Sequence, residues 1–160
     1  MPTRSKIVLG QWRTAIETAA LEVATYALSI PSVAIKDPVG LEAVTTMIGA
    51  HIPLVGSGQA FDLGLISSAE GCQALSRAIL QIGPGPDLPA RDVADAVGEI
   101  VNMLAGSMKR KLSGFGAHLT LGLPIFIHGY LQPSERLSVI AFPAVFGTIE
   151  TIVVITAHRD

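Results

Sequence analysis

Cysteine and charged residues are both scarce in this sequence of 160 residues. Cys72 is the one cysteine, so an intramolecular disulfide is impossible and a reducing compartment is the simpler expectation. Charged residues make up 15% of the chain and the formal net charge is −2, so there is no excess of cations to neutralise nucleic-acid phosphates. We therefore expect no nucleic-acid partner.

Long uninterrupted hydrophobic runs are also missing, although 49% of the residues are hydrophobic. The apolar stretch 7–9 is too short for a signal peptide. The most membrane-like segment, 138–157, is interrupted by Pro143, Gly147 and Glu150, a pattern typical of two strands and a turn. We expect a cytoplasmic protein without membrane association, whose apolar residues fill a core and an oligomer interface.

Motifs of self-contained catalysts are absent from the sequence. It contains neither the phosphate-binding loop G-x-x-x-x-G-K-[ST] nor the nucleophile elbow G-x-S-x-G. The four histidines lack the spacing of metal-ligand pairs, so we expect no metal site. Cys72 has no base close to it in the sequence, which argues against a cysteine nucleophile.

The order of predicted elements indicates an α+β fold in a single domain, residues 1–160. A mostly antiparallel sheet is expected to pack against the helices, in the order helix, two strands, helix, helix, three strands. The third helix is expected to be capped at Asp87 and to end near Leu112. The other predicted elements are helices over 10–28 and 68–81 and strands over 41–55, 60–67, 119–127, 137–146 and 148–157.

The third predicted helix carries the most informative residues of the chain. At 100° per residue, Asp95, Glu99, Asn102 and Gly106 fall within one narrow stripe. The opposite stripe is apolar and is expected to be buried; it consists of Val93, Val97, Ile100, Leu104 and Met108.

The polar stripe lowers the stability of the predicted helix more than an ordinary solvent-exposed face would. Its residues are Asp95, Glu99, Asn102 and Gly106. Asp95 and Glu99 are like charges four residues apart, while Asn102 and Gly106 are poor helix formers. Together these choices cost about 1 to 2 kcal/mol relative to Glu, Lys and Ala. On the residues alone, the stripe can be interpreted either as a functional surface or as an ordinary solvated face.

The pattern Glu99-x-x-Asn102-x-x-x-Gly106, followed by the segment 119–129 with its Pro124, resembles the CheX family of chemotaxis phosphatases. This family belongs to the wider CheC/CheX/FliY group. Its signature is Asp or Ser, three residues, Glu, two residues, Asn and then a proline some twenty positions on, which Asp95, Glu99, Asn102 and Pro124 match in order. CheC-type members usually carry two copies of the motif, whereas this chain has one, as CheX does.

The resemblance implies a CheC-like fold with one long motif-bearing helix, and an enzyme that removes the phosphoryl group from the aspartate of a CheY-like receiver domain. In this family Asn102 would position the attacking water and Glu99 would pair with the lysine of the receiver. Asp95 would add to the acidic docking patch. Gly106 would let the backbone of the partner approach, or would serve helix packing. The chain would need no cofactor of its own, because the receiver brings its Mg²⁺.

Two other interpretations stay open at this point. The chain could be a non-catalytic receiver-binding or flagellar-switch-type module on the same fold, or a structural dimer whose stripe only faces solvent. The family resemblance also implies a homodimer that joins two sheets edge to edge. Apolar strands such as 149–155 fit that arrangement, because an unpaired apolar edge would otherwise aggregate.

Overall fold

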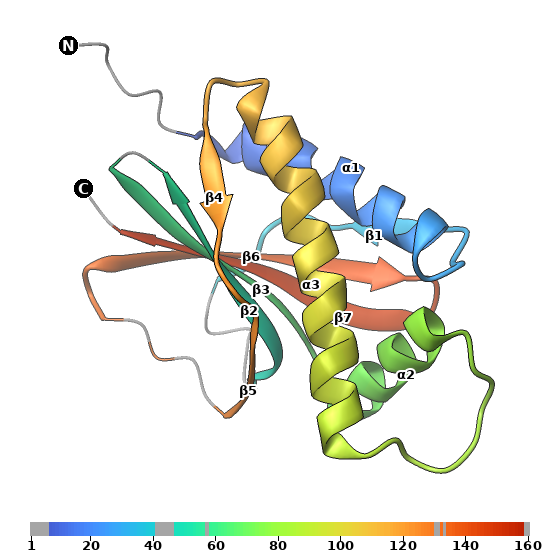
Figure 1. Ribbon diagram of the computed structural model, residues 1–160. Coiled ribbons are helices and arrows are strands. Elements are labelled where there is room, and N and C mark those ends of the chain that lie inside the picture. The colour runs from blue at the N-terminus through green and yellow to red at the C-terminus, as the bar shows by residue number, and fades with distance from the viewer. Residues whose placement is uncertain (1–6, 41–46, 57, 130–131, 133, 159–160) are drawn as a thin grey trace.

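One antiparallel sheet, covered on one face by three helices, forms the computed structural model, which describes residues 7–40, 47–56, 58–129, 132 and 134–158 (Figure 1). The expected α+β class is therefore confirmed. The helices are α1 (Leu9–Tyr26), α2 (Ala69–Leu80) and α3 (Ala90–Ser113). The strands are β1 (Val33–Ile35), β2 (Met47–Gly56), β3 (Gln59–Ser67), β4 (Leu119–Leu121), β5 (Ile125–Gly129), β6 (Leu137–Phe146) and β7 (Ile149–His158).

The sheet has the strand order β1-β6-β7-β3-β2-β4, and β5 pairs with β2 beyond β4. Two hairpins, β2–β3 and β6–β7, make up its centre. The second hairpin turns at Gly147, whose φ of 63° lies in the left-handed region that favours glycine. The segment 138–157 thus forms two strands and a turn, as its sequence predicts. No helix in the described part of the chain is both long and apolar enough to cross a membrane.

Strand β7 lies in the interior of the sheet, between β3 and β6. The expectation that 149–155 could supply an unpaired edge is therefore wrong. The strand is apolar because both of its faces are covered: Val153 and Ile155 join the main core, while Val154 packs with Ile66 and Ala141 in a second cluster. Among the described strands, the edges are β1 on one side and β4 with β5 on the other.

Hydrogen bonds determine where α2 and α3 begin, and the expected cap of α3 at Asp87 is wrong. Ser68 caps α2 by accepting a hydrogen bond from the backbone N–H of Gly71 at 2.9 Å. Helix α3 begins at Ala90 after Pro89, so Asp87 does not cap it. The reason is tertiary: the side chain of Gln73 holds the backbone of Leu88 and keeps the preceding loop outside the helix.

The edge strand next to β2 contains a bulge that the sequence prediction of one strand over 119–127 missed. Leu121 of β4 pairs with Leu54, and Ile125 of β5 pairs with His51. The three residues 122–124 therefore lie opposite the two residues 52–53, so the edge strand carries one extra residue. Pro53 has no N–H to offer the edge strand, and its carbonyl accepts a hydrogen bond from the backbone N–H of Gly122 at 2.9 Å.

Candidate functional site

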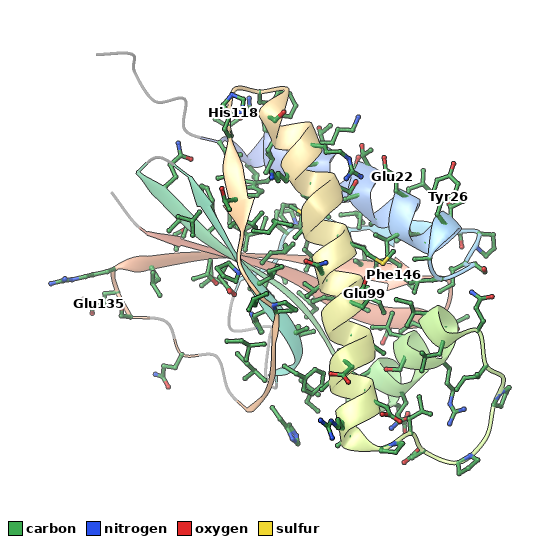
Figure 2. The ribbon with its side chains drawn as sticks, viewed as in Figure 1. Glu22, Tyr26, Glu99, His118, Glu135 and Phe146 are labelled. Atoms are coloured by element: carbon green, nitrogen blue, oxygen red, sulfur yellow. The ribbon has the colours of Figure 1, made fainter. Side chains whose placement is uncertain are left out.

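The polar stripe lies on the outer face of α3, as the helical periodicity predicts. Asp95 and Glu99 are exposed, and Asn102 and Gly106 are half-buried. The residues of the opposite stripe are all buried in the main core. Figure 2 shows Glu99 on the middle of the helix. Glu99 and Asn102 are three residues apart, about 4.5 Å along the helix axis, so both side chains can reach one small target.

The acidic side chains of the stripe are not used inside the molecule. The ion pairs among the described residues all lie elsewhere: within α1, between α1 and the segment after β1, between β2 and β3, and between α1 and the end of α3. Asp95 and Glu99 are therefore two neighbouring carboxylates without a cation from their own chain in the described part. Such a face is suited to receive a cation from a partner, because it loses no existing pair when the partner binds.

The C-terminal half of α3 is tied to α1 through Glu22. Ser107 donates a hydrogen bond to a carboxylate oxygen of Glu22 at 2.5 Å, and Arg110 lies 3.4 Å from the same oxygen. Ser107 is buried, so its hydroxyl needs this partner. Together with the buried apolar stripe, this contact fixes the rotation of α3 about its axis and hence the direction in which Asn102 and Glu99 point.

The N-terminal end of α3 is held by α2 through the loop between them. Gln73 donates to the carbonyl of Leu88 at 3.1 Å and accepts from its N–H at 2.9 Å. Arg77 donates to the carbonyls of Gly83 at 2.8 Å and Gly85 at 3.1 Å, and also to that of Pro86. These hydrogen bonds hold the loop between α2 and α3, which is rich in glycine and proline, in one conformation. They thereby fix the position of the first turn of α3.

We expect Gln73→Ala to lower the free energy of unfolding by about 1 to 2 kcal/mol, because both hydrogen bonds to the half-buried Leu88 backbone are lost. Urea unfolding followed by circular dichroism measures this as a lower midpoint at the same slope. Gln132→Ala, a truncation of the same amide at an exposed loop position, is the control and should leave the midpoint unchanged. Equal midpoints for the two variants would contradict the anchoring role.

Two glycines of α3 have different surroundings. A Cβ at Gly98 would lie 3.7 Å from the ring of Pro124, so Gly98 is where the edge strand packs on the helix. The sequence analysis did not single out Gly98. A Cβ at Gly106 would meet only a guanidinium nitrogen of Arg110 at 4.0 Å. Gly106 is thus open on its outer side, whereas Gly98 is in a packing contact.

Other reactive side chains in the described chain do not form a second catalytic centre. Cys72 is buried, and desolvation raises the pKa of its thiol to about 11, so the nucleophilic thiolate is a minor form at neutral pH. His51 of β2 lies 2.8 Å from Asp62 of β3 and packs over Gly64, which makes it part of the sheet. Within the described ranges no three His, Cys, Asp or Glu residues are grouped closely enough to hold a metal ion.

Comparison with known proteins gives one family and several similar folds. A family model described as "Chemotaxis phosphatase CheX" matches residues 48–143, which include Asp95, Glu99, Asn102, Gly106 and Pro124. No curated protein sequence matches the chain.

Three solved structures illustrate the similarity of fold. The chemotaxis protein CheX from Vibrio vulnificus superposes with a TM-score of 0.73 at 18% identity, covering 99% of this chain and 100% of that chain. A CheX–CheY–BeF3–Mg complex from Borrelia burgdorferi gives 0.71 at 17% identity, covering 97% and 100%. FliY from Thermotoga maritima gives 0.62 at 13% identity, covering 98% and 93%.

Proposed function

Since the chain belongs to the CheX family of chemotaxis phosphatases, we propose that it hydrolyses the phospho-aspartate of a CheY-like receiver domain. The observation that carries this proposal is the pair Glu99 and Asn102 on the exposed face of a helix whose other face is fully buried. The CheX of Borrelia burgdorferi has been crystallised with CheY, BeF3 and Mg²⁺, which supports a receiver as the partner in this family. A receiver of this kind is a cytoplasmic protein, and we place the reaction there.

The proposed reaction needs little covalent chemistry from this chain. An acyl phosphate is already labile, and the Mg²⁺ held by the receiver neutralises charge on the phosphoryl oxygens. Water attacks phosphorus in line: a new bond forms to the water oxygen while the bond to the aspartate oxygen breaks. The products are inorganic phosphate, which keeps the oxygen of the water, and the free aspartate carboxylate. What the phosphatase has to add is the position of the water.

Asn102 is the residue proposed to hold that water. Its amide oxygen can accept a hydrogen bond from the water while its NH2 group donates to a phosphoryl oxygen. A carboxylate in the same place would repel the negatively charged phosphoryl group. Asn102 is half-buried and belongs to a helix that is anchored near both ends. Its amide therefore loses little conformational entropy when the receiver docks.

Glu99 is proposed to pair with the active-site lysine of the receiver, which would orient α3 so that Asn102 enters the pocket. Asp95, one turn away and also exposed, adds negative charge for the same lysine region. Gly106 would allow the receiver backbone to come close to α3, in keeping with the open space at its Cβ position. The chain needs no metal of its own in this scheme, because the Mg²⁺ belongs to the substrate.

Assembly into a homodimer through sheet edges is part of the proposal. The edges left for it among the described strands are β1 and the β4–β5 strand. Strand β5 carries the apolar Ile125 and Ile127, both exposed, and an exposed apolar edge is a surface that natural proteins usually cover.

A panel of phosphorylated receiver domains tests the function directly. Each receiver is phosphorylated with a small phosphodonor, freed of the donor, and mixed with a substoichiometric amount of this protein. We expect at least one receiver to release inorganic phosphate faster, with several turnovers per molecule of phosphatase. The second candidate, a non-catalytic binding module, is favoured by the fold shared with FliY, and it predicts binding of a receiver without faster phosphate release.

A further inference from the structure

Leu123 is a highly exposed leucine, with a relative solvent accessibility of 82% for the residue. It belongs to the segment 122–124 that separates β4 from β5. A leucine held in water gains none of the free energy that its burial would contribute to folding. Single exposed apolar side chains are common on protein surfaces, so the position of Leu123 in the fold decides what its exposure means.

The bulge explains why Leu123 projects from the edge. Leu121 of β4 and Phe126 of β5 both pack against the main core on the helix side, and Gly122 approaches Pro53 on β2. Three residues oppose two at this point, and Leu123 is the middle one of the three, which have no register partner on β2. Bulges turn such a residue out of the strand, and they are frequent beside functional sites.

Leu123 and Pro124 are called the apolar corner below, and Pro124 of this pair packs against α3. The ring of Pro124 comes within 3.7 Å of the Cβ position of Gly98. Gly98 precedes Asn102 by one helical turn and lies on the same side of α3. In Figure 1, β4 and β5 run alongside α3 over this stretch. A body that reaches the amide of Asn102 must therefore also come close to the apolar corner.

We infer that the apolar corner is a docking contact for the phosphorylated receiver domain, next to Glu99 and Asn102. The inference rests on the proposed function, since it takes the receiver as the occupant. Three observations favour that occupant: the contact of Pro124 with α3 one turn before Asn102, the two carboxylates without an ion pair among the described residues, and the bulge that exposes Leu123. An apolar contact at the rim would exclude water from the Glu99–lysine pair and so strengthen it.

A second copy of this chain is the competing occupant of the same edge, and the structure offers a matched control for it. Ile127 pairs with Gly49, next to the pair of Phe126 and Ala50 that faces the helices. Because side chains alternate along a strand, Ile127 points to the sheet face away from α3. It shares the exposed edge with Leu123 but not the neighbourhood of Asn102.

The test compares Leu123→Ser with Ile127→Ser in the full chain. For each variant we would measure KM and kcat for phosphate release, the Kd for a beryllofluoride-loaded receiver, and the mass by light scattering. We expect Leu123→Ser to raise KM and Kd about fivefold to tenfold with kcat and mass unchanged. Leu123→Met should restore both constants, and Ile127→Ser should leave them at the wild-type values.

Several outcomes would overturn the inference. Unchanged KM and Kd for Leu123→Ser would do so. An equal rise of KM and Kd in Leu123→Ser and Ile127→Ser, together with a halved molecular mass, would also do so, because it would assign the corner to the contact with a second copy. The proposed function fails separately if the wild type binds the receiver without releasing phosphate, and the Kd values still test the corner in that case. A wild type that binds no phosphorylated receiver would defeat both.

Discussion

Asn102→Ala removes the acceleration of phosphate release, so that a saturating amount of the variant leaves the phosphorylated receiver at its own rate of hydrolysis. The variant loses the one group proposed to orient the water, an effect expected to lower kcat ~100-fold or more. Binding is expected to persist, because Asp95 and Glu99 still face the receiver lysine. The measurement is phosphate release at saturating phosphatase, together with the Kd for a beryllofluoride-loaded receiver.

Two further variants show whether the amide itself is needed. Asn102→Asp keeps the size of the side chain but places a negative charge beside the phosphoryl oxygens, so it should also lose turnover. Ser113→Ala truncates an exposed polar side chain on the same helix, about three turns further along, and should behave as the wild type. Wild-type turnover by Asn102→Ala would remove Asn102 from the mechanism.

Glu99→Ala is expected to weaken binding of the receiver by about 1 to 3 kcal/mol, because the variant leaves the receiver lysine without its partner in a desolvated contact. In affinity this is a factor of about 5 to 150. Titration calorimetry with a beryllofluoride-loaded receiver measures it. Glu135→Ala makes the same change of charge in a loop well away from α3, as Figure 2 shows, and should leave the affinity unchanged.

The pairing of Glu99 with the lysine can be isolated by a double-mutant cycle. The receiver lysine is replaced by alanine, and all four combinations with wild type and Glu99→Ala are measured. If the two groups interact, the double variant should lose less affinity than the sum of the two single losses. Additive losses would contradict the pairing and would leave Glu99 as a general contributor to the negative field.

The parts of the fold that depend on local pattern could be predicted from the sequence. The apolar repeat of α3 gave both its buried stripe and its exposed stripe, because helical periodicity is set by the backbone alone. The turn at Gly147 follows in the same way from a single residue with a strong local preference.

The parts that depend on pairing between distant segments could not be predicted. The sequence of 149–155 does not predict that β3 and β6 lie on either side of this strand. An interior strand and an apolar edge strand have similar sequences. The break in the predicted strand 119–127 arises opposite Pro53, about seventy residues earlier in the chain. The start of α3 after Asp87 likewise depends on Gln73, a residue of another helix.

The candidate site was predictable in its residues but not in its surroundings. Asp95, Glu99, Asn102 and Gly106 share a stripe for reasons internal to one helix. Their surroundings come from tertiary contacts: Pro124, which belongs to the bulge of the edge strand, packs against Gly98 of α3. A glycine in mid-helix at position 98 was the one sequence signal that could have pointed to this contact.

Separate roles for Asn102 and Glu99 are tested most directly by steady-state kinetics on one phosphorylated receiver, with wild type, Asn102→Ala and Glu99→Ala measured side by side. We predict that the first variant loses kcat while its affinity for the beryllofluoride-loaded receiver stays near the wild-type value. The second should raise KM at least fivefold and retain turnover at saturation. Two variants that change kcat and KM alike, or a wild type that never exceeds the rate of the receiver alone, would contradict the account.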